Sequence, residues 1–388
     1  MADERVREEG LSEARGSERP FEGSSRVSGA FTQMLLTERR FLIMVMIGMF
    51  AAGATYGDPK LGMWVGFLFA SYAAVANDSI QTIGTFIASN RQKPWWALWV
   101  FIGGIFLATV WYSWSTHGGD VSYERLASKG FEQAPQSFEF LQVAAPLFLI
   151  ILTRMRMPVS TTFLLLSSFA TQSKGITSML EKSLIGYFLA FGLAVALWFP
   201  LGRLMARSFK GEAHPAWRVG QWITSGLLWS VWIQQDAANI AVYLPRSMSG
   251  VEFAAFAGTI FIGLGLLFKM GGERIQRVVD EKSNVVDVRA ATVIDLLYAV
   301  ILFVFKLWSK VPMSTTWVFL GLLAGRELSL AARGASEGGR TVREAGRLVL
   351  RDASFALIGL LVSLVIACTT NEVVREGIFA DLKALFGG

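Results

Sequence analysis

The sequence predicts an all-α polytopic membrane protein with two inverted-topology repeats, broken helices and re-entrant helical hairpins. Composition gives the first reason: 53% of the 388 residues are hydrophobic and 17% are charged, whereas soluble domains carry roughly a quarter charged residues. An internal repeat gives the second, because RMPVSTTF (156–163) recurs as KVPMSTTW (310–317). A proline that interrupts an apolar run at two matching places indicates a duplicated membrane unit.

Long apolar runs follow one another along the chain, and about 20 apolar residues suffice for one helical crossing of a bilayer. The predicted spans are 41–57, 62–89, 94–115, 140–172, 178–202, 217–245, 250–269, 290–325 and 353–371. Two of them, 140–172 and 290–325, are too long for one helix, and the Pro-x-Ser-Thr-Thr sequence breaks each of them. We therefore expect two hairpins, each of which enters and leaves the membrane on one side.

Basic residues in the connecting loops predict the orientation. Cytoplasmic loops are enriched in Lys and Arg, which assigns 203–218, 269–289 and 326–351 to the cytoplasm. The 116–139 loop has more acidic than basic residues and is expected outside. The first hairpin then enters from outside and the second from the cytoplasm, so the two halves have opposite orientations. We expect a multi-pass protein of the inner (plasma) membrane with a cytoplasmic N-terminus.

The domain organisation follows from these spans. Residues 1–36 are rich in Glu, Arg, Ser and Gly, and such a segment cannot bury enough apolar surface to fold alone. The predicted parts are a disordered cytosolic tail at 1–36, an additional N-terminal transmembrane helix at 37–60, repeat 1 at 61–202, a cytoplasmic linker at 203–216, repeat 2 at 217–371 and a C-terminal tail at 372–388.

Several functional classes are disfavoured. The net charge is +6, and the basic residues lie in short loops between apolar spans. A membrane location explains these residues better than binding to nucleic acid does. The sequence holds no phosphate-binding loop, GxSxG, HExxH or CxxC pattern, which argues against ATP-driven transport by this chain alone and against hydrolase chemistry. We expect no enzyme activity and no cofactor.

The repeated Ser-Thr-Thr predicts an anion site. A half-helix that starts after a break presents free N–H groups and the positive end of its dipole, and hydroxyls add further donors. The alternative is that the hydroxyls only repair a proline kink, but repair alone does not require the same residues in both halves. The predicted substrate-binding residues are Ser160, Thr161, Thr162, Ser314, Thr315 and Thr316.

Two acidic residues, Asp78 and Asp236, lie within apolar spans, where a carboxylate is costly unless it is paired or functional. Each has a carboxamide before it and another three residues later, on the same helix face. Hard oxygen ligands suit Na⁺, a desolvated carboxylate suits a proton, and a structural bridge between helices is the third possibility. The predicted cation-binding or proton-coupling residues are Asn77, Asp78, Gln81, Gln235, Asp236 and Asn239, with Asp78 and Asp236 as the Na⁺ ligands if sodium is the coupling ion.

At these residues the chain resembles the inorganic phosphate transporter (PiT) family. That family carries G-A-N-D-x-x-N-A-x-G-T and P-x-S-T-T-H motifs in both inverted halves. The resemblance covers about 70–330, with four motifs in the right order. The positions that match are Asn77, Asp78, Gly84 and Thr85 in the first signature, Asp236, Ala238 and Asn239 in the second, and Pro158–Thr162 and Pro312–Thr316 in the hairpins.

The chain departs from the family pattern at Gln81, Gln235, Val242–Tyr243, Phe163 and Trp317. The resemblance implies secondary-active symport of an inorganic oxyanion, phosphate first, with Na⁺ or H⁺ by alternating access, and it implies a homodimer. Transport of sulfate or another oxyanion, and a transport-inactive scaffold or sensor of the same fold, remain the alternatives.

Overall fold

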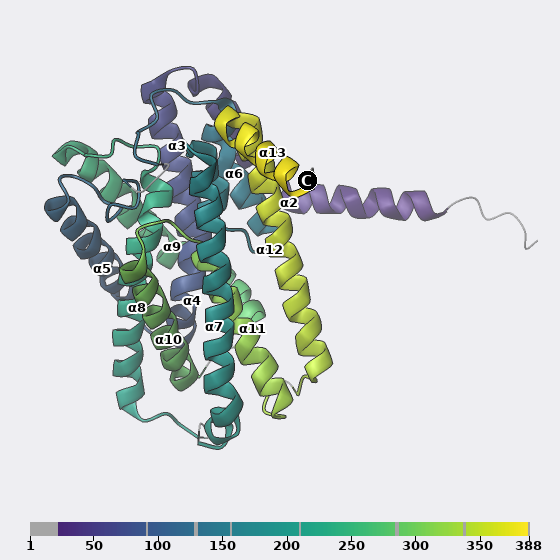
Figure 1. Cartoon of the computed structure of the whole chain (residues 1–388). Helices are drawn as coiled ribbons and strands as arrows, with labels where there is room; N and C mark the ends of the chain where they lie inside the picture. The colour runs from purple at the N-terminus through teal and green to yellow at the C-terminus, as the bar shows by residue number, and fades with distance from the viewer. Residues whose placement is uncertain are drawn as a thin grey trace, which may run out of the picture. The chain divides into compact units, whose positions relative to one another are not determined.

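The computed structural model describes residues 22–90, 92–127, 131–155, 157–208, 211–283, 287–336 and 339–386, and all regular structure in them is helical (Figure 1). The chain divides into two compact units, residues 1–50 and 51–388. Within the described part, the first unit contains the beginning of α2 (Glu22–Thr55), and every other helix belongs to the second unit. This second unit holds the site described below.

The first half of the second unit begins with a helix that changes its pitch. Asp58 caps α3 (Pro59–Ala73), because its side chain accepts hydrogen bonds from the Lys60 and Leu61 backbone N–H groups at 2.8 and 3.0 Å. The helix then passes through a π-helical turn, η2 (Ala74–Asp78), and continues as α4 (Ser79–Ser89). Short π-helical turns frequently occur at functional sites, and this one contains the first polar motif.

Both predicted hairpins are present. In the first, α6 (Phe140–Arg154) leads to a non-helical break and returns as a π-helical turn, η3 (Thr162–Leu166), and a 3₁₀ turn, η4 (Ser167–Phe169). In the second, α10 (Val288–Trp308) and α11 (Thr315–Ala332) flank the break. The remaining helices are α5 (Trp95–Thr116), α7 (Ser173–Ser208), α8 (Pro215–Ala241), α9 (Gly250–Ser283), α12 (Val342–Thr370) and α13 (Glu372–Phe386).

The hairpins open at opposite ends of α7. The first hairpin ends next to Ser173, where α7 begins. The second hairpin ends where Arg333 Nε donates to the Phe199 carbonyl near the other end of α7, at 2.6 Å. At 1.5 Å per residue these two points are about 39 Å apart along the helix. In Figure 1 the ends of α7 and α11 accordingly lie together at the lower end of the bundle.

Each hairpin also packs on a helix of the other half. The second arm of the second hairpin, α11, lies along α7, and the second arm of the first hairpin, η3 and η4, lies against α12. Gly321 and Gly325 allow α11 to approach so closely that a Cβ at either position would collide with the α7 carbonyls of Tyr187 and Phe191. Small residues four apart commonly permit such contact between membrane helices.

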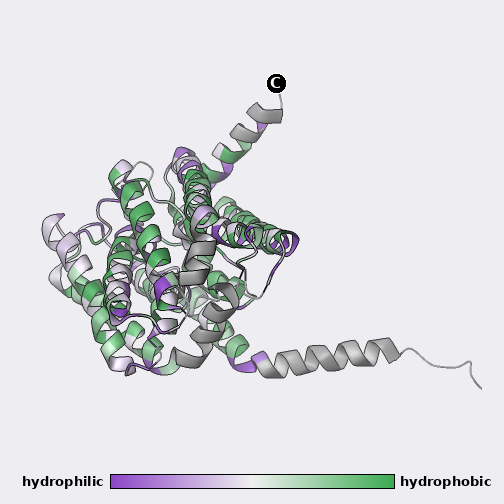
Figure 2. Ribbon diagram, turned by 90° about the horizontal axis from the view of Figure 1, so that it is seen from below, coloured by the Kyte–Doolittle hydropathy of each residue, from purple (hydrophilic) through white to green (hydrophobic). Residues whose placement is uncertain are grey.

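The protein is a multi-pass membrane protein. Among the described residues, five helical segments are long and apolar enough to cross a bilayer: Trp95–Thr116, Ser173–Pro200, Gly250–Met270, Val288–Trp308 and Val342–Thr370. Figure 2 shows hydrophobic residues in green over much of the helical bundle. Large apolar side chains such as Phe188 and Val365 are about two-thirds exposed, as lipid-facing residues are (65% and 66%). Two predicted spans are not among these five. The span 62–89 is divided by η2, and the span 217–245, which forms α8, carries several buried polar residues.

Two segment boundaries differ from the prediction, and the predicted C-terminal tail keeps its boundary at residue 372. Helix α2 begins at Glu22, inside the segment predicted as a disordered tail. A helix that has already nucleated extends at little cost through residues of fair propensity. Residues 1–21 lie outside the described part. Helix α7 continues to Ser208 and shortens the predicted linker, and the C-terminal segment forms α13.

Candidate functional site

The tips of the two hairpins meet inside the bundle. The rings of Phe163 and Trp317, which follow the two Ser-Thr-Thr sequences, pack with centroids 5.5 Å apart. The Thr162 hydroxyl donates to the Met313 carbonyl of the opposite hairpin at 3.1 Å. All six predicted hydroxyl residues are at least 95% buried. The two copies of the motif, far apart in the sequence, therefore share one location.

The serine of each motif caps the helix that follows it. Ser160 Oγ accepts from the Phe163 N–H at 3.3 Å, and Ser314 Oγ accepts from the Trp317 N–H at 3.2 Å. Each serine oxygen thus fixes the first turn of its hairpin arm, while its hydroxyl hydrogen remains able to donate. The first turns still present their N–H dipoles toward the break, which favours negative charge there.

The second acidic motif lies directly at this junction. Asn239 Nδ2 donates to Asp236 Oδ1 at 2.6 Å and to Thr162 Oγ1 at 3.2 Å. Thr315, from the other hairpin, interacts electrostatically with Asp236. One turn of α8 therefore lies at both hairpins, with a carboxylate and a carboxamide.

The first acidic motif lies close to the same place. Asp78 is 96% buried, accepts from Asn77 Nδ2 at 2.7 Å, and interacts electrostatically with Asp236. Two buried carboxyl groups in mutual range cannot both carry a negative charge at low cost, so a site of this kind favours a bound cation or a proton. The predicted residue Gln81 has its side chain outside the described set.

Several buried acceptors at the junction lack protein partners. Within the described residues, Thr161 Oγ1, Gln235 Oε1 and Asn239 Oδ1 have no hydrogen-bond partner. Gln235 uses its amide N–H to donate to the Leu302 carbonyl at 3.0 Å. An unsatisfied polar atom in a membrane interior is costly, so these atoms mark a place where a bound ion or water would complete the hydrogen bonding.

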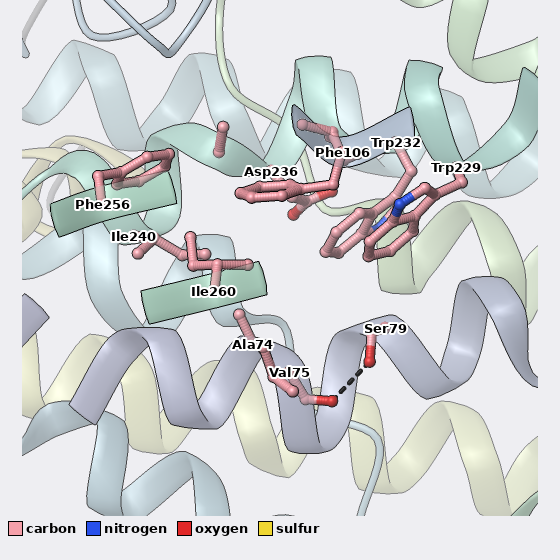
Figure 3. Close-up of a pocket in the computed structure, with 12 residues that line it drawn as sticks. Ala74, Val75, Ser79, Phe106, Trp229, Trp232, Asp236, Ile240, Phe256 and Ile260 are labelled. Atoms are coloured by element: carbon pink, nitrogen blue, oxygen red, sulfur yellow. Dashed lines mark hydrogen bonds between the residues drawn. The ribbon is translucent and has the colours of Figure 1, made fainter. Parts of the chain in front are cut away.

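A small cavity adjoins Asp236 (Figure 3). It lies among α5, α8, α9 and the η2 region, with Trp229 and Trp232 stacked along one side and Ser79 on another. Its volume of about 20 Å³ holds roughly one water-sized species. The lining is apolar apart from Asp236 and Ser79, so the cavity is too small and too apolar for an oxyanion.

Sequence reasoning missed three residues of the junction. Tyr298 of α10 donates its hydroxyl to the Thr315 carbonyl at 2.9 Å. Lys182 of α7 donates to the Ser309 and Val311 carbonyls in the second break at 2.8 and 2.6 Å. The position of Lys182 inside an apolar span was a signal that could have identified it, because buried lysines in spans are rarely without a role.

The third missed residue is Arg125, which comes from the loop between α5 and α6. Its Nε donates to the Gln234 carbonyl at 2.7 Å, and its Nη1 donates to the Lys310 and Val311 carbonyls at 3.3 and 3.4 Å. Burial lowers the pKa of Arg125 to about 10, so the guanidinium is charged at neutral pH. No sequence signal separated it from other loop arginines.

No protein-family model matches the sequence, and no curated protein matches it. Among solved structures, the chain is similar to one described as the sodium-dependent phosphate transporter, at 16% sequence identity and a TM-score of 0.51. The similarity covers 81% of this chain and 97% of that chain. The chain therefore has the fold of that transporter, which agrees with the predicted resemblance and fold class.

Proposed function

We propose that this protein is a secondary-active transporter of an inorganic oxyanion, with phosphate as the first candidate substrate. Transport is coupled to Na⁺ or H⁺ in this proposal. The observation that carries the proposal is the meeting of both Ser-Thr-Thr hairpin tips with two carboxylates at one buried junction. Hydroxyls and helix N-termini supply the donors that a tetrahedral oxyanion requires. The structural neighbour is described as a phosphate transporter, and this supports phosphate as the first substrate to test.

Electrostatics make ion coupling a requirement of the proposed site. Asp78 and Asp236 are both buried and interact with one another, so phosphate alone would bring a third negative group into the same volume. Like charges in a poorly solvated site repel strongly. A cation or protons must therefore enter with the anion, and the cavity beside Asp236 has room for one small species but not for phosphate.

The transport cycle that we propose follows from the organisation of the hairpins. Each hairpin tip belongs to one half and packs on a helix of the other half, and the hairpins open at opposite ends of α7. These features support the two inverted repeats, 61–202 and 217–371, and alternating access by movement of one repeat against the other. Asn77, Gln81 and Gln235 assist the two carboxylates in this proposal.

Orientation is tested by cysteine labelling. Cys368 is the single cysteine, so a Cys368→Ser background leaves no other thiol. Ser137→Cys, in the loop expected outside, should react with an impermeant maleimide in intact cells, and Glu212→Cys, between α7 and α8, should react only after permeabilisation. Both positions are exposed, so accessibility is matched. Equal labelling of both in intact cells would refute the inverted arrangement.

Substrate binding is tested with Thr161→Val. The Thr161 hydroxyl has no protein partner within the described residues, so the isosteric change removes no described internal hydrogen bond and should not lower the melting temperature. If the hydroxyl binds phosphate, affinity should fall about 10- to 100-fold, because a hydrogen bond to a charged group contributes about 1.5–3 kcal/mol. Titration calorimetry of the purified protein with phosphate and with sulfate, in Na⁺, measures this.

Wild-type protein should bind phosphate more tightly than sulfate, because hydroxyl and carboxylate acceptors can bond the P–OH group that sulfate lacks. Thr369→Val is the control, since that exposed hydroxyl donates within α12 at 2.7 Å and should not affect binding. Tighter sulfate binding, or unchanged phosphate binding by Thr161→Val, would contradict the assignment.

A further inference from the structure

A third buried carboxylate lies away from the hairpin junction. Asp295 of α10 is 99% buried and accepts two hydrogen bonds, from Thr85 Oγ1 of α4 at 2.7 Å and from Ser225 Oγ of α8 at 2.5 Å. It lies about 10 Å along α10 from Val288, at 1.5 Å per residue. Three helices from both halves therefore converge on one acidic side chain that the proposed substrate site does not use.

Asp295 has no cationic partner among the described side chains. In the part of the chain that the structure describes, no ion pair includes Asp295, although a buried charge is normally paired. Helix α4 has no titratable residue. The Lys306 ammonium, on the same helix, lies over the Tyr123 ring, 5.0 Å from its centroid, and so does not neutralise Asp295.

Two basic side chains, one on α10 and one on α11, are already paired with other acidic residues. Arg289 pairs with Asp287 at 2.6 Å, and Arg326 pairs with Glu327 at 3.6 Å. The other titratable residues on α10 and on the helices that pack against it are Tyr298 on α10, Arg218 and Asp236 on α8, and Lys174, Glu181, Lys182, Tyr187, Arg203 and Arg207 on α7.

A polar path connects Asp295 to one end of the bundle. Gln221 Nε2 donates to the Thr85 carbonyl at 3.3 Å, Asn90 Nδ2 donates to Gln221 Oε1 at 2.9 Å, and Trp222 Nε1 donates to Asn90 Oδ1 at 2.9 Å. Gln221 and Asn90 are buried, and buried polar networks are costly unless every member is satisfied. This network ends where α4 ends and α8 begins, at the end expected to face the cytoplasm.

A second connection leads from Asp295 toward the substrate junction. Tyr298 is three residues further along α10 and lies on the same helix face. Its hydroxyl donates to the Thr315 carbonyl, and Thr315 interacts electrostatically with Asp236. Asp295 thus lies between the hairpin junction and the end of the bundle that carries Asn90.

We propose that Asp295, with Thr85 and Ser225, is a proton-binding site of the transporter, distinct from the Asp78–Asp236 pair. The carboxylate takes up one proton to become a neutral carboxylic acid and releases the same proton, so no other bond changes. A proton fits better than Na⁺, because each hydroxyl oxygen is at hydrogen-bond distance from a carboxylate oxygen, whereas ligands of a shared cation point at the ion. This proposal rests on the proposed transport function.

Infrared difference spectroscopy tests the site without relying on transport. The wild-type protein in liposomes, compared between acid and alkaline pH, should show a carbonyl band of a buried protonated carboxyl, and Asp295→Asn should lack this band. Asp352→Asn removes a half-exposed carboxylate beside Arg351 and should retain it. Persistence of the full band in Asp295→Asn would overturn the proposal, whether or not the protein transports phosphate.

Uptake kinetics separate proton binding from a purely structural bridge. An asparagine can still join Thr85 to Ser225, so a structural role predicts that Asp295→Asn keeps the wild-type pH profile of uptake. We expect instead a flat profile, with phosphate affinity within about threefold of wild type because the substrate junction is untouched. An unchanged profile would overturn the proposal, whereas absence of phosphate uptake by the wild type would overturn only the proposed function.

Ser225→Ala provides a second variant if Asp295→Asn does not fold. It removes one donor that stabilises the charged carboxylate, so the midpoint of the pH profile, or of the infrared band, should move to higher pH by about one unit. An unmoved midpoint would contradict the assignment to Asp295. The dependence of phosphate uptake on Na⁺ concentration should give the same Na⁺ affinity for wild type, Asp295→Asn and Ser225→Ala. A loss of Na⁺ affinity in Asp295→Asn alone would overturn the proposal and identify a sodium site instead.

Discussion

Asp236→Asn is expected to abolish ion-coupled phosphate accumulation without unfolding the protein. The substitution removes a charge at nearly constant volume, and the amide oxygen can still accept the hydrogen bond from Asn239. The cation or proton, however, loses one of its two carboxylates. Breaking a buried charge interaction commonly costs about 3–5 kcal/mol, so coupled uptake should fall by about 10²- to 10³-fold.

The melting temperature separates loss of function from loss of fold in this variant. Asp236 and Asp78 repel one another while no cation is bound, so removal of one charge should leave the melting temperature unchanged or raise it. Asp352→Asn, a half-exposed carboxylate on α12, is the matched control and should retain uptake within about twofold, since exposed ion pairs contribute about 0–1 kcal/mol. Full accumulation by Asp236→Asn would remove this residue from the coupling site.

The second large effect is expected from Arg125→Met. Arg125 donates to the Gln234, Lys310 and Val311 carbonyls, so a single side chain holds the break of the second hairpin against α8. Methionine fills similar space but removes these donors. The Val311 carbonyl keeps its bond from Lys182, whereas the Lys310 carbonyl loses its described side-chain donor, and a buried unsatisfied group costs about 1–3 kcal/mol. We expect a clear drop in melting temperature and a loss of phosphate uptake, because Thr315 and Thr316 follow directly after this break.

The control for Arg125→Met lies at the same hairpin tip. Lys310 forms an ion pair with Glu124, and the two side chains are 63% and 43% exposed. Exposed pairs contribute about 0–1 kcal/mol, so Lys310→Met should change melting and uptake little. If both variants behave alike, a general charge effect at the tip accounts for the result, and the role assigned to the buried Arg125 contacts is wrong.

Much of this arrangement was predictable because its signals are local. The prolines at 158 and 312 prevent a continuous helix, and the hairpin breaks occur where the sequence places them. The spacing of Asp236 and Asn239 put both side chains on one helix face, and the structure joins them by a hydrogen bond. That Asp78 approaches Asp236 agrees with the duplicated motif.

The remaining features depend on tertiary contacts that no local pattern encodes. Arg125 reaches the second hairpin from a loop of the first half, and Asp295 finds its partners on α4 and α8, far from it in sequence. The second arm of the first hairpin adopts π-helical and 3₁₀ turns instead of a regular helix and packs against α12, which local propensity does not indicate. The start of α2 at Glu22 was likewise not visible in a segment of mixed charge.

The most direct test of the central claim is uptake of labelled phosphate into proteoliposomes that contain the purified wild-type protein. Uptake is compared under an inward Na⁺ gradient, an inward proton gradient and no gradient, with protein-free liposomes as the baseline. The proposed site predicts accumulation above equilibrium under at least one gradient and only equilibration without one. Uptake that never exceeds the protein-free baseline for a folded protein, or accumulation of sulfate in preference to phosphate, would contradict it.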